Sequence, residues 1–228
     1  MAFKGFQKSF FEFFAALEQN NNRAWFTDHK ALYEEAVVEP ALAFIAAMGP
    51  GLESISPHFV ADPRKSGGSM FRIYRDTRFS KDKTPYKTHM AVQFRHKLAK
   101  DVHAPGFYFH ANSQELVLAG GIWRPATDAV AKIRQAIASD GASWRSAVGG
   151  ASFRVYFEVH GESLKRPPRG FPADHPMVED LKRKDFTYFH GAAPGELLRT
   201  DLVDFTLKRY ALCKPMLGFL CEALDVPF

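Results

Sequence analysis

The chain has 228 residues, is 46% hydrophobic and 24% charged, and carries a formal net charge of +5, which is the composition of an ordinary globular protein with a sizeable core. No run approaches the roughly 20 apolar residues of a membrane helix, and residues 1–14 lack the pattern of a signal peptide, so we expect a cytoplasmic protein with no membrane partner. The 22 phenylalanines predict a core rich in aromatic rings.

The first part of the chain has the periodicity of helices. Apolar residues recur at helical spacing over residues 6–17, and Asn22 is placed to cap a second helix over residues 23–38. Pro40 either breaks that helix or starts a third one. Gly49-Pro50-Gly51 is expected to end the helical part.

The middle of the chain changes to short runs of β-branched and aromatic residues. Three strands are expected over residues 90–94, 106–111 and 115–122, and they would pair as an antiparallel meander. Helical spacing returns over residues 126–139, and a short helix is expected after it over residues 140–148.

The last part of the chain is expected to end in a long helix. Residues 153–159 and 186–189 are predicted strands, and residues 201–224 a closing helix kinked at Pro215. Helices thus bracket a strand-rich middle. We therefore expect one α+β domain over residues 1–228, with a mostly antiparallel central sheet between N-terminal and C-terminal helices.

The two cysteines of the chain lie in the predicted closing helix. Eight residues separate Cys213 from Cys221, which is about 12 Å along a helix and too far for a disulfide. Both are expected to be reduced core residues. No spacing of ligands predicts a metal site, and no cofactor is predicted.

The positive charge of the chain is concentrated in one segment. Residues 64–100 hold eleven Lys or Arg and only two acids, Asp76 and Asp82, so this segment carries +9 and the rest of the chain −4. Such a segment is either a solvated positive face or a site for an anion.

Residues 71–89 are the most basic part of this segment and read FRIYRDTRFSKDKTPYKTH. Pro85 favours an extended chain before it, and the spacing of the cations fits neither a strand nor an amphipathic helix, so we expect an ordered loop. Arginine matches phosphate or carboxylate oxygens, lysine adds a mobile charge, and tyrosine stacks on a base. The predicted ligand-binding residues are Arg72, Arg75, Arg78, Lys83, Tyr86 and Lys87.

Two residues of the same loop are candidates for acid–base chemistry. Asp76 would orient a neighbouring arginine or act as a general base, and His89 adjoins the cations and would exchange a proton. The chain contains no HExxH, Gly-x-Ser-x-Gly, CxxC or GxGxxG sequence. Whether the protein is an enzyme therefore stays open.

Two weaker signals lie on either side of the loop. Residues 65–69, Lys-Ser-Gly-Gly-Ser, lack the ending of a P-loop and are interpreted as a flexible turn, with a backbone nest for an anion as the alternative. His110 lies at the end of an expected strand and is either an acid or base or an ordinary packed histidine.

The run from Phe71 to Lys87 resembles the signature of a bacterial family catalogued as domain of unknown function 2461. Further motifs agree with this resemblance: Asn21-Asn22 with Trp25-Phe26, Gly106-Phe107-Tyr108, Gly120-Gly121-Ile122-Trp123, Arg169-Gly170 and Asp174-His175-Pro176. The resemblance covers nearly the whole chain and implies one domain of full length. It implies no particular activity and no catalytic residues.

Three functions are compatible with these residues. The leading hypothesis is a module that binds, or acts on, a phosphate-bearing small ligand or nucleotide through the basic loop. The second is non-enzymatic binding of nucleic acid along the same cations, with an affinity that falls steeply as salt rises. The third is a structural or interaction protein whose basic motif is an internal ion-pair network, with acids from outside the loop. The sequence does not specify the oligomeric state.

Overall fold

The structure, a computed structural model, describes residues 3–98 and 104–228. Its centre is one sheet with the strand order β1-β2-β3-β5-β4, in which each neighbouring pair is antiparallel. The α+β class with a mostly antiparallel central sheet is confirmed, and so is the meander of the first three strands. The strands are β1 (Met90–Arg95), β2 (Gly106–Ala111), β3 (Leu116–Ile122), β4 (Glu158–His160) and β5 (Phe186–Ala192).

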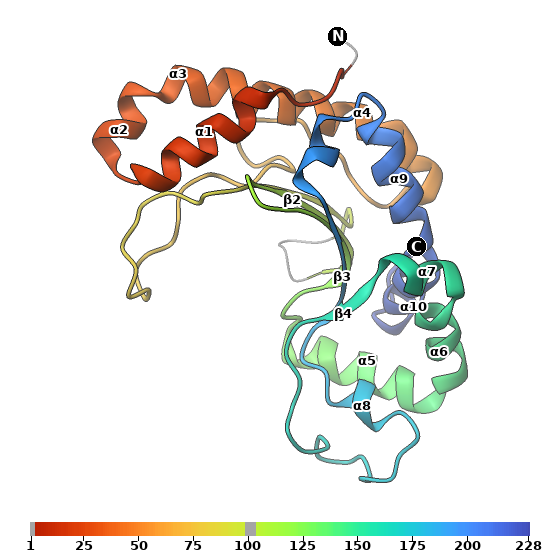
Figure 1. The fold of residues 1–228 in the computed structure, drawn as a ribbon. Helices are drawn as coiled ribbons and strands as arrows, with labels where there is room; N and C mark the ends of the chain where they lie inside the picture. The colour runs from red at the N-terminus through yellow and green to blue at the C-terminus, as the bar shows by residue number, and fades with distance from the viewer. Residues whose placement is uncertain (1–2, 99–103) are drawn as a thin grey trace.

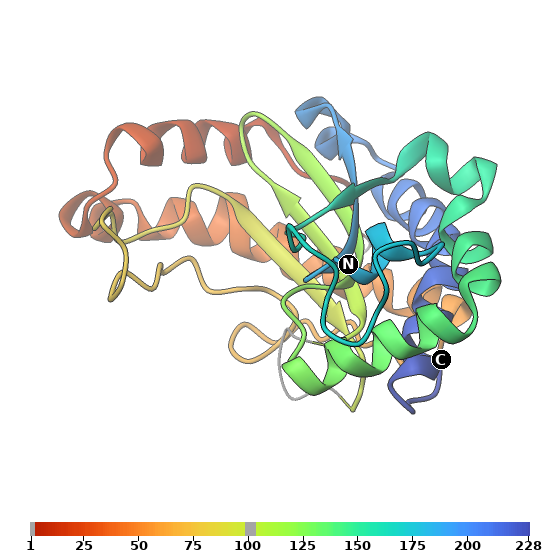
Figure 2. The same cartoon turned by 90° about the horizontal axis from the view of Figure 1, so that it is seen from below.

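Helices precede and follow the sheet and also separate its strands. In chain order they are α1 (Lys8–Gln19), α2 (Arg23–Asp28), α3 (Lys30–Tyr33), η1 (Glu34–Val38), α4 (Glu39–Ile55), α5 (Thr127–Ser139), α6 (Gly141–Gly149), α7 (Ala151–Tyr156), α8 (Val178–Leu181), η2 (Pro194–Leu198), α9 (Leu202–Leu212) and α10 (Lys214–Ala223). The N-terminal helices and α9 lie over one face of the sheet, the former at the top of Figure 1 and α9 at its upper right. Figure 2 views the sheet from its other side, with the N-terminal helices behind it.

The core lies between the sheet and the helices that cover it. Val92 and Phe94 of β1 and Phe107 and Phe109 of β2 are fully buried. The Phe44 ring of α4 packs 4.7 Å from the Phe109 ring, and aromatic rings are frequent throughout this core, as expected. Because side chains alternate along a strand, the residues between these positions point to the opposite face of the sheet.

The N-terminal helices begin as expected but end later. Asn22 caps α2, because its side-chain oxygen accepts the Trp25 N–H at 3.0 Å. The expected stop at Gly49-Pro50-Gly51 is wrong, since α4 continues through Pro50 to Ile55. A Cβ on Gly51 would come within 2.1 Å of Leu207 Cδ1 in α9. The glycine therefore permits close packing of α4 on α9, and this packing offsets the hydrogen bond that Pro50 cannot form.

Residues 30–55 form one continuous helical stretch, in place of the break or new start expected at Pro40. By length and composition this stretch is apolar enough to cross a membrane, whereas the sequence was expected to contain no such stretch. Its apolar residues Val37, Phe44 and Met48 are fully buried in the core. Such burial is typical of a core helix in a soluble α+β domain.

The strand expected over residues 153–159 is wrong in its first part. Residues 151–156 form α7, and β4 begins only after them. Phe153 and Phe157 are one helical turn apart, and their rings stack at 5.1 Å. The aromatic residues of this run thus follow a helical spacing rather than the alternation of a strand.

The closing helix divides into α9 and α10 at Cys213, whereas a single helix kinked at Pro215 was expected. Pro215 lies in the first turn of α10, where its missing N–H costs no hydrogen bond. Cys213 and Cys221 are buried and form no disulfide, as expected. Burial raises the pKa of the Cys221 thiol to about 12.

Candidate functional site

A cavity of about 320 Å³ lies on the face of the sheet that points away from the N-terminal helices. We call it the sheet cavity. One cross-strand row runs through it, from Gln93 to Tyr108, Ala119 and Phe189 on four neighbouring strands. The middle of this row holds the small residue Ala119, and Gly121 of β3 also lines the cavity. The short side chain of Ala119 leaves the space that the larger neighbours enclose.

Aromatic rings form much of the wall of the sheet cavity. Tyr108 and Phe189 rise from the strands, Phe71 lies on the chain before β1, and Trp123 follows β3 directly. The Phe71 and Tyr108 rings are 6.3 Å apart, and Trp123 is 46% exposed. Flat apolar walls of this kind suit a ligand with a planar ring.

Two histidines and a tyrosine form a polar cluster at one side of the sheet cavity. The His89 and His110 rings stack at 4.2 Å, and Tyr108 Oη lies 3.3 Å from His110 Nδ1. His110 Nε2 lies 3.8 Å from a carboxylate oxygen of Glu115. No group of three or more His, Cys, Asp or Glu side chains within residues 3–98 and 104–228 is arranged to hold a metal ion.

The protonation of this cluster is set mainly by burial. Burial, with smaller effects of His110 and Lys87, lowers the pKa of His89 to about 4. Burial also lowers the pKa of His110, and it raises the pKa of Tyr108 to about 12. At neutral pH the two imidazoles are therefore uncharged, and each can donate and accept a hydrogen bond.

Lys87 brings a cation to the edge of the sheet cavity. Its Nζ donates to the Arg72 carbonyl oxygen at 2.8 Å and lies 5.4 Å from the centre of the Phe71 ring. Burial and the neighbouring Arg72 lower the pKa of Lys87. The backbone positions this side chain, because Lys87 N–H donates to the Ile73 carbonyl at 2.7 Å and Phe71 N–H to the Ala91 carbonyl at 2.9 Å.

We call residues 71–89 the basic arm, because they extend from the sheet as a long loop (Figure 1). At its tip, residues 75–84, the two acids neutralise two arginines. Arg78 forms an ion pair with Asp76 at 2.7 Å, and Arg75 contacts both Asp82 and the Thr84 hydroxyl. The Arg78 hydrogen bonds lower the pKa of Asp76 to about 2. For Asp82, the Thr84 N–H and then Arg75 lower the pKa to about 2.

The remaining predicted residues divide between the tip and the base of the basic arm. Lys83 is at the tip, where its Nζ donates to the Thr77 carbonyl at 2.8 Å. Tyr86 is buried at the base, and its ring stacks on Phe26 at 4.1 Å. Arg72 is exposed, and its side chain forms no hydrogen bond or ion pair with the described residues.

The structure thus brings together only part of the predicted site. Lys87 and His89 line the sheet cavity, whereas Asp76 and the ligand-binding candidates of the tip do not. Tyr108, Trp123 and Phe189 line it as well and were not predicted. Tyr108 and Phe189 belong to aromatic runs that mark strands in the sequence, but the pairing of β2 with β3 and of β3 with β5 that brings them together is not visible there.

Comparison with known proteins gives one match. A family model described as "Conserved hypothetical protein (DUF2461)" matches residues 9–219, a range that includes the basic arm and the residues that line the sheet cavity. No curated protein matches the chain, and no solved structure matches it.

Proposed function

The chain belongs to the DUF2461 family, and we propose that it binds a phosphate-bearing small ligand with a planar ring, such as a nucleotide, in the sheet cavity. The observation that carries this proposal is an aromatic-walled cavity with the cation of Lys87 at its edge. Its volume of about 320 Å³ falls within the roughly 300 to 1,000 Å³ of small-molecule sites.

The walls supply what a planar ring needs. Phe71, Tyr108 and Trp123 offer faces and edges for stacking. The neutral imidazole of His89 offers hydrogen bonds to polar atoms on the edge of the ring. A nucleobase combines a flat apolar face with donors and acceptors on its edge, so it matches both kinds of contact.

The charge of the sheet cavity supports an anionic ligand. No Asp or Glu is among the described residues that line it, and Lys87 is the cation of its wall. Because burial lowers the pKa of Lys87, a bound phosphate would stabilise its charged form. Arg72 lies beside Lys87, since the Arg72 carbonyl oxygen accepts a hydrogen bond from Lys87 Nζ.

The other functions considered fit different parts of the basic arm. Internal ion pairs account for Arg75 and Arg78 at the tip but leave Arg72 without a partner among the described residues. A cavity favours a small ligand over the open basic stripe that nucleic acid would need. The proposal assigns binding and no reaction. We also propose that the protein works in the cytoplasm, where Cys213 and Cys221 would stay reduced.

The test is calorimetric binding of a panel of nucleosides, nucleotides and ring-free sugar phosphates. Ala119→Leu should fill the floor of the sheet cavity and weaken binding at least tenfold. The same change on the exposed face of α5, Ala131→Leu, should leave affinity within twofold.

A second pair of variants tests the cation. Lys87→Ala should weaken nucleotide binding about tenfold, whereas Lys81→Ala, an exposed lysine at the tip, should leave it within twofold. Thermal unfolding of each variant checks that the fold is retained. The proposal fails if no member of the panel binds, or if a ligand binds Ala119→Leu and Lys87→Ala as tightly as it binds the unaltered protein.

A further inference from the structure

A second cavity, of about 380 Å³, lies next to the sheet cavity. We call it the turn cavity, because the turn over residues 66–69 forms one side of it. Phe71 and Gln93 line both cavities, so the two share a wall. Arg72 and Arg95 line the turn cavity from the base of the basic arm and from the end of β1.

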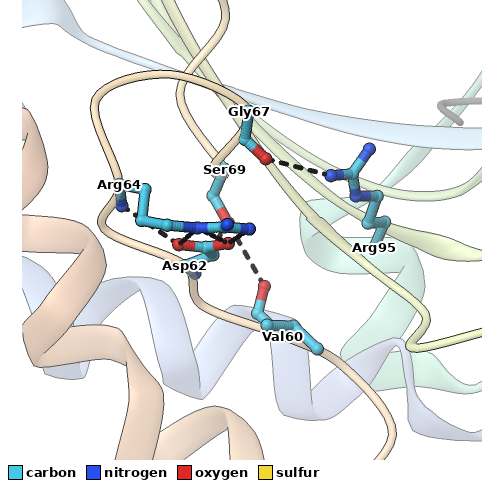
Figure 3. A network of polar contacts seen from close by, with 6 residues as sticks. All are labelled: Val60, Asp62, Arg64, Gly67, Ser69 and Arg95. Atoms are coloured by element: carbon cyan, nitrogen blue, oxygen red, sulfur yellow. Dashed lines mark hydrogen bonds and ion pairs between the residues drawn. The ribbon is translucent and has the colours of Figure 1, made fainter.

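The turn cavity has positive charge that the surrounding residues do not neutralise. Neither Arg72 nor Arg95 forms an ion pair with any residue that the structure describes. The guanidinium of Arg95 reaches the Gly67 carbonyl only at 3.4 Å, which is a long hydrogen bond (Figure 3). The described residues that line this cavity include no Asp or Glu.

The nearby acid, Asp62, already has a partner. Its carboxylate accepts three hydrogen bonds from the Arg64 side chain, at 2.6 to 3.0 Å (Figure 3). These bonds are the main cause of the lowered pKa of Asp62, and Arg95 contributes less than Arg64. Asp62 is therefore engaged by Arg64 and forms no ion pair with Arg95.

The turn that borders this cavity is held in place by the chain around it. Ser69 N–H donates to the Asp62 carbonyl at 2.8 Å, and Asp62 N–H donates to the Ser69 hydroxyl at 3.0 Å. Gln93 N–H donates to the Ser69 carbonyl at 2.8 Å, which joins the turn to β1. Gly68 permits this tight path, since a Cβ there would come within 2.3 Å of the Arg64 carbonyl oxygen. The turn side of the cavity is thus anchored before any ligand arrives.

We propose that the turn cavity binds a phosphoryl group of the same ligand whose ring lies in the sheet cavity. This inference rests on the proposed function and narrows the ligand to one with at least two phosphoryl groups, such as a nucleoside diphosphate or triphosphate. Lys87 would contact the first phosphoryl group, at the edge of the sheet cavity. Arg72 and Arg95 would hold the next one beyond the shared wall, because a guanidinium fork matches two phosphate oxygens.

The test compares one nucleoside with its mono-, di- and triphosphate, and with inorganic triphosphate, by calorimetry. Affinity should rise at least tenfold from the monophosphate to the diphosphate. Arg95→Ala and Arg72→Ala should remove this gain and leave monophosphate binding unchanged. Lys97→Ala is the matched control, since Lys97 is exposed, two residues from Arg95, and lines neither cavity.

Further outcomes separate this inference from the proposed function. A second result would be that the monophosphate and the diphosphate bind equally tightly, and that Ala119→Leu and Lys87→Ala weaken this binding but Arg95→Ala does not. This result would overturn the phosphoryl site and keep the proposed function. A third result would be that inorganic triphosphate binds as tightly as the nucleoside triphosphate and that Arg95→Ala weakens this binding. This result would overturn the proposed function and support the turn cavity as a phosphoryl site. Arg95→Lys should recover part of the diphosphate affinity, which a purely structural role of Arg95 would not require.

Discussion

The tip and the base of the basic arm have the same kinds of side chain in different surroundings. At the tip, Arg75 and Arg78 each meet an acid of the loop, and the Arg78 side chain is 77% exposed. At the base, Lys87 and Arg72 meet no acid among the described residues and lie against cavity walls instead. Local charge thus locates the segment, whereas the position of each cation relative to the sheet decides whether a ligand can reach it.

Anchoring differs between the two regions as well. The side-chain amide of Asn21 bonds both backbone groups of Tyr86, at 3.0 and 3.1 Å. Phe79 at the tip is 95% exposed. The base is therefore part of the packed domain, and the tip is not.

The largest effect is expected from the two tyrosines that pair across the base. Tyr86 is 5% exposed and its partner Tyr74 is 58% exposed. Tyr86→Ala should lower the free energy of unfolding by about 3 kcal/mol, because it removes a buried ring. Tyr74→Ala should lower it by less than about 1 kcal/mol. Urea unfolding measures both, and equal losses would show that the base is not packed as described.

A smaller effect is expected from acid. The pKa of His89 is about 4 in the folded chain against an ordinary 6.5, so the unfolded chain takes up the proton first. Stability should therefore be full above pH 6.5 and fall as the pH drops towards 4. The expected loss is about 2 kcal/mol, since one pKa unit equals about 1.4 kcal/mol and His89 keeps some exposure.

Urea unfolding at pH 7 and at pH 4.5, for the unaltered protein and for His89→Gln, measures this loss. The variant should lose less stability on acidification. A His89 resonance that titrates near pH 6.5 would contradict the burial of this ring at the base.

The smallest effect is expected at the tip. Asp76→Asn removes the ion pair with Arg78, but both side chains are mostly exposed, and such pairs contribute little to stability. The midpoint of urea unfolding at pH 7 should stay within experimental error of the unaltered protein. A clear loss would mean that the tip is packed against another part of the chain, and the contrast between the two regions would not hold.

The fold was predictable where the pattern is local. The short β-branched and aromatic runs of β1, β2 and β3 and the cap at Asn22 both appear in the sequence as short-range signals. The continuation of α4 through Pro50 does not appear in the sequence. It depends on the close approach of Gly51 to Leu207, which lies far away in the chain. A local helix breaker is overridden here by tertiary packing.

The site was predictable in part for the same reason. Lys87 and His89 belong to the charged segment that the sequence marks. Tyr108 and Phe189 meet only through the register of β2, β3 and β5, and a charge count carries no information about it. The hollow itself depends on Ala119, whose small size is unremarkable until its neighbours are known.

The basic arm has two legs, the segments that lead to its tip and back from it, and their pairing affects how the chain responds to proteolysis. Arg75 N–H donates to the Pro85 carbonyl at 2.9 Å, and Lys87 N–H donates to the Ile73 carbonyl at 2.7 Å, so the legs are bonded to each other below the tip. Exposed loop tips are where proteases cut and where insertions are tolerated. A peptide bond broken after Lys81 would leave both legs held together. The tip is thus a place where this chain can be nicked or lengthened while both cavities keep their walls.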